Sequence, residues 1–430
     1  MTAPLPWLAP YSDAPLDGAV LIPGSKSLTN RALVLAALAD GPSVLSGPLD
    51  SRDTFLMAGA LTALGATIER NVVERDGIDW TVTPSSWESN SPVDIDCGLA
   101  GNVMRFVPPI AALSPAKVSF DGDEHARVRP MSTIIGALRA LGAEIDDDGR
   151  GALPFTLHGT GGLKGGEVEI DASASSQFVS ALLLAGARYE HGIDIRHTGS
   201  TLPSMPHILM TVTQLRLRGV TVDDFLPDRW VVKPGPIAAL DQEIEPDLSN
   251  AGPFIAGALV THGTVRIRNW PAETDQPGDQ WQDIARAFGA TVESDAADMV
   301  FTAGDTIDGV DLDLHDVGEL TPVIAAIAAL SDGPSRLTGI AHLRGHETDR
   351  LSALATEINR LGGRVTELED GLEIIPAPLH GGTIRTYDDH RMAHTGVVLG
   401  LRTPEIFVEN VATTAKTYPN FAPDWERFVT

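Results

Sequence analysis

Cysteine and basic residues are the two residue classes that this chain has little of. Its single cysteine, Cys97, excludes an intramolecular disulfide and a cysteine-rich zinc cluster, and it favours a reducing compartment. Lys and Arg number 31 against 58 Asp and Glu, which gives a formal charge of -27. That balance opposes binding to nucleic acid or to an anionic membrane through a broad basic surface, so we expect neither as a partner. If the ligand is an anion, a few focused cations must attract it.

Long apolar runs and nucleotide-binding motifs are also missing. No 18 apolar residues occur in succession, and residues 1–17 lack a basic segment followed by an apolar run. We therefore expect no membrane span, no secretion signal and a cytoplasmic location. The phosphate-loop pattern GxxxxGK(S/T) is absent, so the Gly24-Ser25-Lys26-Ser27 string does not predict a nucleotide site. The Asp388-Asp389-His390-Arg391 string could suggest a metal site, but we favour a polar helix start that presents Arg391, and we expect no metal and no cofactor.

An internal repeat organises what is there. In five segments a helical pattern ends on a glycine and then runs into a polar-apolar strand. The glycines recur every 70 to 77 residues, at Gly65, Gly142, Gly219, Gly289 and Gly362. A recurrence this regular indicates repeated supersecondary units, and each glycine suits the left-handed position just after a helix.

A second series of helices, rich in Ala and Leu, alternates with the first. These helices begin near Ser27, Asn102, Ser176, Asn250, Thr321 and Asp389. Six units of helix, strand, helix and further strands in 430 residues predict a mixed α/β fold with two domains of three units. The crossover falls near residue 243, after a Pro-Gly-Pro at 234–236. We predict one domain over 24–243 and a second, discontinuous domain over 1–23 and 244–430.

Cations stand at several of the predicted helix starts. Capping residues account for Asn250 and Thr321, but they do not predict Lys26, Arg31 or Arg391, because cations are unfavourable near a helix N-terminus. A bound anion would remove that conflict, since the first N–H groups of a helix have no intrahelical partner. If the repeat points all six starts into one cleft, their dipoles and cations converge on a shared ligand.

Two polar loops each allow two interpretations. Ser175 and Ser176 precede an apolar helix, where they either cap it or form a neutral phosphate cradle together with helix amides. Arg127 and Arg129 are either a solvated basic pair or a guanidinium site for a carboxylate or phosphate.

The C-terminal third carries a further charged segment with two interpretations. His346-Glu347-Thr348-Asp349-Arg350 either forms ion pairs along a helix surface or presents Glu347 as a proton donor or acceptor beside Arg350. Lys416 on its own would be solvated. Gly101 suits either a plain turn or close approach of the backbone to a ligand.

Five strings together suggest a family. GSKSLTNRA, SSQF, HETDR, DDHRMA and TAKTYP, in this order between residues 24 and 419, resemble the 5-enolpyruvylshikimate-3-phosphate synthase family. The resemblance implies two domains of three βαβαββ units each, arranged as an inside-out α/β barrel, with the active site in the interdomain cleft. It also implies transfer of the enolpyruvyl group of phosphoenolpyruvate to the 5-hydroxyl of shikimate 3-phosphate, with release of phosphate, by a monomer.

The resemblance also assigns expected roles to residues. Glu319 is the candidate base for the 5-hydroxyl, and Glu347, with Lys26, is the candidate acid for the methylene carbon. The expected shikimate 3-phosphate ligands are Lys26, Ser27, Arg31, Ser175, Ser176, Gln177, Ser204, Glu319 and His346. The expected phosphoenolpyruvate ligands are Lys26, Gly101, Asn102, Arg129, Gln177, Arg350, Arg391 and Lys416.

Three of these positions depart from the common family pattern. Asn102 replaces the usual Thr beside the phosphoenolpyruvate pocket and has a larger side chain. His346 replaces Lys, which weakens one substrate contact or makes it pH-dependent. Glu319 replaces Asp with a local shift in register.

Two other functions remain open at this point. The related UDP-N-acetylglucosamine enolpyruvyl transferases share the fold, but they typically carry a reactive Cys or Asp in the loop that corresponds here to 122–130. Cys97 lies elsewhere and is expected to be a buried small residue. A non-catalytic anion-binding clamshell protein would explain the cations and serines, but it gives no reason for Glu319 and Glu347 among them.

Overall fold

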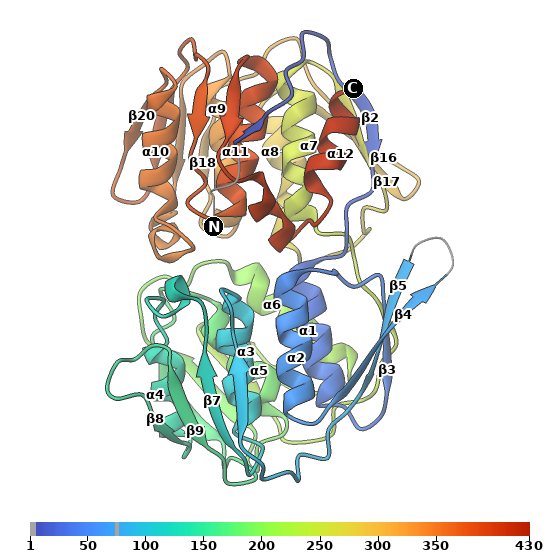
Figure 1. Ribbon diagram of the computed structural model, residues 1–430, viewed down its shortest axis with the longest axis vertical. Coiled ribbons are helices and arrows are strands. Elements are labelled where there is room, and N and C mark those ends of the chain that lie inside the picture. The colour runs from blue at the N-terminus through green and yellow to red at the C-terminus, as the bar shows by residue number, and fades with distance from the viewer. Residues whose placement is uncertain (1–5, 74–76) are drawn as a thin grey trace. The chain divides into compact units, whose positions relative to one another are not determined.

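The computed structural model describes residues 6–73 and 77–430, and the chain forms two compact units. Unit 2 is the continuous stretch Gly24–Ile244, and unit 1 combines Met1–Pro23 with Glu245–Thr430. In Figure 1 the blue N-terminal strands accordingly lie among the yellow, orange and red elements of unit 1.

Unit 2 contains three four-stranded sheets and six α-helices in its described part. Its helices are α1 (Lys26–Ala37), α2 (Arg52–Ala63), α3 (Gly101–Ala111), α4 (Ser132–Ala140), α5 (Gln177–Gly186) and α6 (Met205–Leu217). Its strands are β3 (Ser43–Ser46), β4 (Thr67–Val73), β5 (Gly77–Thr83), β6 (Val93–Asp96), β7 (Lys117–Asp121), β8 (Glu144–Asp146), β9 (Phe155–His158), β10 (Gly166–Ile170), β11 (Ile193–His197), β12 (Val222–Asp223), β13 (Arg229–Val232) and β14 (Gln242–Glu243). The strand orders are β14-β3-β5-β4, β6-β7-β9-β8 and β10-β11-β13-β12. Each sheet begins with a parallel pair and continues antiparallel.

Unit 1 repeats this plan. Its helices are α7 (Leu248–Val260), α8 (Trp281–Ala287), α9 (Thr321–Ala329), α10 (Arg350–Arg360), α11 (His390–Arg402) and α12 (Phe421–Val429), with short 3₁₀ turns η3 (Gly318–Leu320), η4 (Ala341–Gly345) and η5 (Val411–Lys416). Its strands are β1 (Trp7–Leu8), β2 (Asp17–Val20), β15 (Thr264–Ile267), β16 (Thr291–Asp295), β17 (Asp298–Thr302), β18 (Asp311–Asp313), β19 (Ser335–Thr338), β20 (Arg364–Glu367), β21 (Leu372–Ile375), β22 (Gly382–Ile384) and β23 (Ile406–Val408). They form sheets β16-β17-β15-β2, β18-β19-β21-β20 and β1-β23-β22.

Two strands complete sheets that are distant in sequence. β2 pairs in parallel with β15, so that Asp17 faces Thr264, and β14 pairs in parallel with β3, so that Gln242 faces Leu45. The chain therefore leaves unit 1 after β2 and returns to it after β14.

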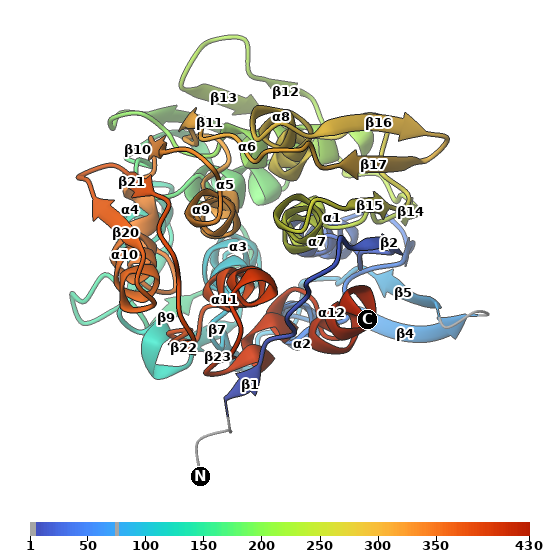
Figure 2. The ribbon, with the colours of Figure 1, turned by 90° about the horizontal axis from the view of Figure 1, so that it is seen from above.

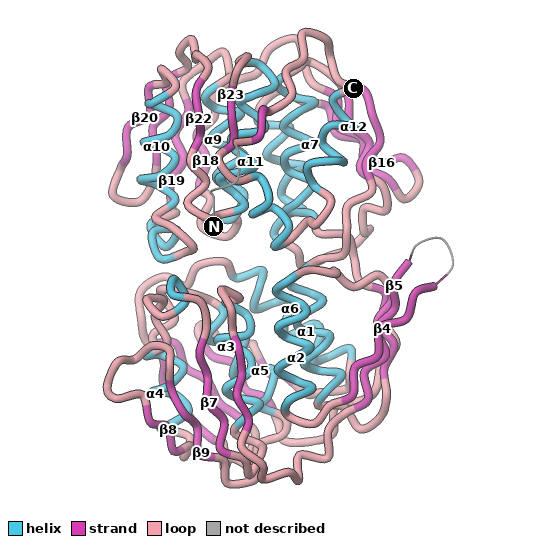
Figure 3. The backbone as a smooth tube through the Cα atoms, viewed as in Figure 1, coloured by secondary structure: helices cyan, strands magenta, loops and turns pink. Residues whose placement is uncertain are grey.

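The layers follow from the composition of the helices. Helices α3, α7 and α9 are buried at every position and mostly apolar, and helices buried on all sides form the core of a domain. In unit 1, α7, α9 and α11 pack against one another with the sheets around them (Figure 2). In unit 2, α1 and α3 both pack against α5, with β4 and β5 on one side of this group and β7, β8 and β9 on another (Figure 3). The two-domain mixed α/β fold is confirmed, but the sheets of the described residues stay separate and close no barrel.

The predicted repeat corresponds to real helix boundaries. Six helices start within two residues of the predicted positions: α1, α3, α5, α7, α9 and α11. Five helices are each followed by the predicted glycine at a positive φ, between 77° and 105°: α2, α4, α6, α8 and α10. The capping interpretation of Asn250 is wrong. Asp247 caps α7 by accepting a hydrogen bond from the Asn250 backbone N–H, and the Asn250 side chain donates to the Thr417 carbonyl instead.

Candidate functional site

Arg350 is the centre of a buried charged group in unit 1. It is the first residue of α10, and its Nε and Nη2 lie 2.8 and 3.2 Å from the two carboxylate oxygens of Asp389, the residue that caps α11. Burial alone would lower the pKa of Arg350, but the attraction of Asp389 and Glu347 outweighs burial and raises that pKa above its usual value. The guanidinium therefore stays charged and joins two helix starts.

Glu347 lies between two cations. Its Oε2 accepts a hydrogen bond from Arg350 Nη2 at 3.0 Å, and its Oε1 accepts one from Lys416 Nζ at 2.5 Å. The side chains of Glu347 and Lys416 are only 8% and 12% exposed. The interpretation of Lys416 as a solvated cation is thus wrong, and the same contacts argue against a merely solvent-facing Glu347.

Ser249, at the start of α7, joins two further charged residues. Its hydroxyl donates to Glu319 Oε1 at 3.3 Å, and its carbonyl accepts from Arg391 Nη1 at 3.0 Å. Burial lowers the pKa of Arg391, and the carboxylates of Asp247 and Glu319 only partly offset that effect. The starts of α7, α9 and α11 thus bring one carboxylate and one buried guanidinium to the same serine.

His346 makes a contact that a lysine could not make. Its Nδ1 lies 3.3 Å from Arg350 Nη1. Because a guanidinium only donates, Nδ1 must accept in this arrangement, which requires an unprotonated Nδ1. A protonated lysine has no acceptor, so the exchange of Lys for His changes the contact rather than only weakening it.

Arg31 is buried in unit 2 without an ion-pair partner among the described residues. It is 2% exposed, and its guanidinium donates to the Thr211 and Ser180 hydroxyls and to the Ser27 and His207 carbonyls at 2.7 to 3.4 Å. Burial lowers its pKa to about 9. Four neutral acceptors fix the group but leave its charge uncompensated, which favours binding of an anion.

Gly101 brings two guanidinium groups close to the start of α3. A Cβ atom on Gly101 would lie 2.7 Å from Arg105 Nη1 and 3.1 Å from Arg129 Nη2, so a side chain there would displace both. Arg105 Nη1 lies 3.3 Å from Gln177 Oε1, and Arg129 Nη1 donates to the Leu99 carbonyl at 3.3 Å. The backbone at Gly101 therefore lies directly against two guanidinium groups, which a residue with a side chain would prevent.

Lys26 opens α1 beside an acid that the motifs did not indicate. Its Nζ is 3.8 Å from Asp53 Oδ2, and the Asp53 side chain is 6% exposed. Asp53 lies in the first turn of α2, where a carboxylate complements the helix dipole.

The predicted hydroxyl and amide ligands of unit 2 also lie at helix starts. Ser175 Oγ accepts from the Gln177 backbone N–H at 3.3 Å, while Ser176 is buried and makes no capping hydrogen bond. Asn102 is buried in the first turn of α3. Ser204 precedes α6 with φ 57° and ψ 50°, a left-handed conformation that is unfavourable for serine. Strain of this kind clusters at ligand sites.

In unit 1 the contacts above join His346, Glu347, Arg350 and Lys416, and Ser249 joins Glu319 to Arg391. The remaining candidates belong to unit 2. The sequence interpretation did not include Asp53, Ser249 or Asp389 as site residues. Asp389 lies within the DDHR string, so its position before a helix was a usable signal for a cap, whereas its pairing with Arg350 was not visible in the sequence.

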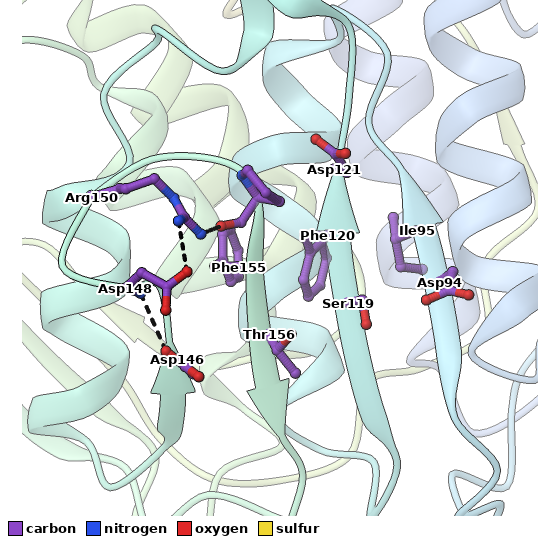
Figure 4. Close-up of a pocket in the computed structure, with 11 residues that line it drawn as sticks. Asp94, Ile95, Ser119, Phe120, Asp121, Asp146, Asp148, Arg150, Phe155 and Thr156 are labelled. Atoms are coloured by element: carbon purple, nitrogen blue, oxygen red, sulfur yellow. Dashed lines mark hydrogen bonds and ion pairs between the residues drawn. The ribbon is translucent and has the colours of Figure 1, made fainter.

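A pocket elsewhere in unit 2 contains none of the predicted residues. It has a volume of about 410 Å³ and lies over β6, β7, β8 and β9 (Figure 4). Its lining includes Asp94, Asp121, Asp146 and Asp148, and the dashed lines in Figure 4 mark Arg150 bound to Asp148. Acidic side chains dominate this pocket, which makes it unsuited to the anions discussed above.

Cys97 is fully buried, as predicted. Burial raises the pKa of its thiol, the neighbouring Asp96 and Asp121 add to this effect, and together they bring the pKa to about 12. A thiol of this kind is almost never a thiolate at neutral pH and is a poor nucleophile.

Neither a membrane-spanning helix nor a metal cluster occurs in the described part of the chain. No helix there is long and apolar enough to cross a membrane. The residues described also contain no group of three or more His, Cys, Asp or Glu that could hold a metal ion.

Comparison with known proteins agrees with this geometry. The family model described as EPSP synthase (3-phosphoshikimate 1-carboxyvinyltransferase) matches residues 10–425. The chain belongs to the EPSP synthase family. A curated relative from Kocuria rhizophila, named 3-phosphoshikimate 1-carboxyvinyltransferase, is 53% identical over 428 residues, which are 98% of this chain and 96% of that protein. The expectation that the five motif strings raised is thereby confirmed.

Solved structures show the same fold at lower identity. An EPSP synthase from Acinetobacter baumannii is 24% identical, covers 97% of both chains and superimposes with a TM-score of 0.78. The enolpyruvyl transferase NikO from Streptomyces tendae is 19% identical, with 97% and 96% coverage and a TM-score of 0.76. The EPSP synthase family fold is therefore shared with an enolpyruvyl transferase of different name.

Proposed function

We propose that the chain transfers the enolpyruvyl group of phosphoenolpyruvate to the 5-hydroxyl of shikimate 3-phosphate, giving 5-enolpyruvylshikimate 3-phosphate and phosphate. This reaction belongs to the shikimate pathway, which leads to chorismate and the aromatic amino acids. Family membership supports the reaction. The observation in the structure that carries the proposal is the buried Glu347 between Arg350 and Lys416, because it places a proton-transfer group among cations that suit a phosphate.

Phosphoenolpyruvate is the ligand proposed for the cations of both units. In unit 1 these are Arg350, Arg391 and Lys416, and in unit 2 they are Lys26 and Arg129. Gly101, Asn102 and Gln177 complete the proposed set. Preorganised positive charge of this kind stabilises the negative charge that develops as phosphate departs. When the ligand binds, Lys416 and Arg350 exchange part of their contact with Glu347 for the phosphate and carboxylate of phosphoenolpyruvate.

Shikimate 3-phosphate is the ligand proposed for a second set of residues. Its carboxylate would bind Ser27 and Arg31, and the uncompensated charge of Arg31 supports that assignment. The set proposed for its phosphate and ring is Lys26, Ser175, Ser176, Gln177, Ser204, Glu319 and His346. The strained backbone at Ser204 supports a ligand role, since such strain persists mainly where function requires it.

The chemistry requires one base and one acid. Glu319 removes the proton of the 5-hydroxyl while that oxygen bonds to C2 of phosphoenolpyruvate, and Glu347, with Lys26, protonates the methylene carbon. The tetrahedral ketal phosphate then collapses: the bond from C2 to the phosphate oxygen breaks, phosphate departs, and a methyl proton returns to Glu347. The electrons of the broken C–H bond form the new double bond.

The measurement that tests this proposal is phosphate release from phosphoenolpyruvate with shikimate 3-phosphate, run in parallel with UDP-N-acetylglucosamine as acceptor. We expect release with the first acceptor only. The buried Cys97 thiol argues against a cysteine-dependent transferase for the nucleotide sugar. Folded protein that releases no phosphate with shikimate 3-phosphate would refute the proposal, and tight binding of both anions without release would favour the clamshell binding protein.

We also propose that the enzyme acts as a monomer in the cytoplasm, with the two small-molecule substrates as its only partners. The charge of -27 supports the lack of nucleic-acid and membrane partners. Light scattering after size exclusion tests the monomer: a mass near 45.5 kDa is expected, and a mass near twice that value contradicts it.

A further inference from the structure

His342 is a histidine of unit 1 to which the proposed function gives no role. It lies on η4, and its ring is the middle one of three: the His315 ring is 6.1 Å away and the His346 ring 6.0 Å away, between centroids. Its Nε2 is buried and has no hydrogen-bond partner in the structure. A buried polar atom without a partner is rare and calls for an explanation.

The neighbour of this nitrogen is the turn that carries Glu319. A Cβ atom on Gly318 would lie 2.6 Å from His342 Nε2, so the ring rests directly against the backbone of η3. Glycine is the one residue at 318 that lets the ring come this close. Glu319, the next residue, is the candidate base of the proposed reaction.

The surroundings keep the His342 ring neutral. Burial lowers its pKa most, His315 and Arg350 also lower it, Glu319 acts in the opposite direction, and together they bring the pKa to about 4. The groups that face it are therefore His315 before η3, Glu319 on η3, His346 after η4 and Arg350 on α10. A neutral imidazole carries one N–H and one lone pair, so it can donate a hydrogen bond without adding a charge beside Arg350.

We propose that His342 is a positioning residue for Glu319: its Nε2–H is the donor that holds the Glu319 carboxylate while this group takes the proton of the substrate hydroxyl. The inference rests on the proposed function, since Glu319 is the base of that reaction. In the structure the hydroxyl of Ser249 holds one carboxylate oxygen of Glu319 at 3.3 Å, whereas His342 Nε2 makes no hydrogen bond to any described residue, so the bond from His342 is what the proposal adds for the reacting state. A carboxylate held from both sides keeps the orientation that proton transfer requires.

Side chains that mimic one imidazole nitrogen test which atom matters. Gln reaches the position of Nε2, and Asn reaches that of Nδ1. We expect His342→Ala and His342→Asn to lower kcat by about 10- to 100-fold with the KM for phosphoenolpyruvate within about twofold, and His342→Gln to recover most of the loss. The exposed His380, in the same unit, supplies the matched control His380→Gln, which should leave kcat unchanged. A kcat of His342→Ala within twofold of wild type, or equal losses for Asn and Gln, overturns the proposal.

The pH profile and a double-mutant cycle add readouts that a purely structural role would not move. A donor to the carboxylate favours its ionised form, so the acidic limb of the pH–kcat profile should move to higher pH in His342→Ala and stay in place in His342→Gln. Gly318→Ala should lower kcat by displacing the ring, yet it should cost little more in the His342→Ala background, where the ring is gone. An unmoved acidic limb or additive losses contradict the inference.

NMR of ¹⁵N-labelled histidine separates this inference from the proposed function, because it needs no turnover. At pH 7 the resonance of His342, assigned with His342→Gln, should be that of the Nε2–H tautomer, and Glu319→Gln should lower the pKa of His342, because Glu319 acts to raise it. A His342 ring protonated on Nδ1 alone overturns the inference even in an active enzyme. Wild-type protein that releases no phosphate would refute the proposed function. The tautomer of His342 would still decide whether its Nε2–H is the donor to Glu319.

Discussion

Lys416 donates a hydrogen bond to Glu347 Oε1 across 2.5 Å, although 69 positions separate the two residues in the chain. The pair keeps a carboxylate and an ammonium group ready at the same place, both largely shielded from water. Lys416 can exchange the Glu347 carboxylate for the anion of an incoming substrate. This exchange releases Glu347 for proton transfer, so that substrate binding and proton transfer are coupled. This coupling makes Glu347 the first residue to test.

We predict that Glu347→Gln retains binding of both substrates and loses turnover. Gln keeps the shape of the side chain and an acceptor for Lys416 and Arg350, but it cannot take up or deliver the proton. The expected loss is about 10²-fold or more in kcat, the scale of general acid-base catalysis. Stopped-flow phosphate release and titration calorimetry with each substrate measure the two quantities. Glu373→Gln, at an exposed ion pair on β21, is the matched control, and unchanged turnover in Glu347→Gln would remove Glu347 from the mechanism.

We predict that Arg31→Gln raises the KM for shikimate 3-phosphate by about 10- to 100-fold, because a hydrogen bond to a charged group contributes about 1.5–3 kcal/mol. The KM for phosphoenolpyruvate should change less than threefold. Burial lowers the pKa of Arg31, but arginine keeps its charge in proteins, so the contrast between the two KM values should persist across the working pH range of the enzyme. Arg150→Gln, an exposed arginine of the same unit, is the control, and equal changes in the two KM values would contradict the assignment.

We predict that Gly101→Ala weakens binding of phosphoenolpyruvate without unfolding the protein. The added methyl group meets the flexible ends of Arg105 and Arg129, so the side chains shift while the backbone stays. We expect a KM for phosphoenolpyruvate at least about tenfold higher, since the charge-assisted contact of Arg129 is misplaced. Gly136→Ala is the matched control, because a Cβ there meets nothing within 4 Å on helix α4. A wild-type KM in Gly101→Ala would show that Arg129 does not bind this substrate.

We predict that Asp389→Asn destabilises unit 1. The variant keeps a side-chain oxygen that can cap α11, but it leaves the charge of Arg350 without its main partner in a buried site. Removal of one member of a buried pair costs about 3–5 kcal/mol, whereas an exposed pair contributes about 0–1 kcal/mol. Urea unfolding of Asp389→Asn beside Arg336→Gln, which breaks the exposed pair with Glu373, measures the contrast. Equal unfolding free energies for the two variants would show that Glu347 alone compensates Arg350.

The repeat was predictable because its signals are local. A glycine at positive φ after a helix depends on a few neighbouring residues, so Gly65, Gly142 and Gly219 could be placed from the sequence alone. A helix that is buried on all sides is a continuous, mostly apolar stretch of sequence, so it can be recognised without the structure. The starts of α1, α3 and α5 are accordingly within two residues of the predicted positions.

The partners of the site residues were not predictable, because they are distant in sequence. Asp389 pairs with Arg350 over 39 positions, and nothing near either residue indicates the other. Capping of α7 by Asp247 rather than Asn250 was missed for a different reason: three polar residues within one turn can cap equally well, and packing against Thr417 decides which one does. His342 gave no signal, since one histidine between an alanine and a leucine matches no motif.

The pairing of β2 with the distant strand β15 of the same unit also sets an order of events during synthesis. Strand β2 emerges from the ribosome early, but its partner β15 is encoded only at Thr264–Ile267. Unit 2 is complete once Ile244 has emerged, because β14 then reaches β3. Domains generally fold as units and the earlier one first. Unit 2 can therefore finish folding while the N-terminal strands β1 and β2 are still unpaired. The last folding step is then the pairing of these two strands with the newly synthesised part of unit 1.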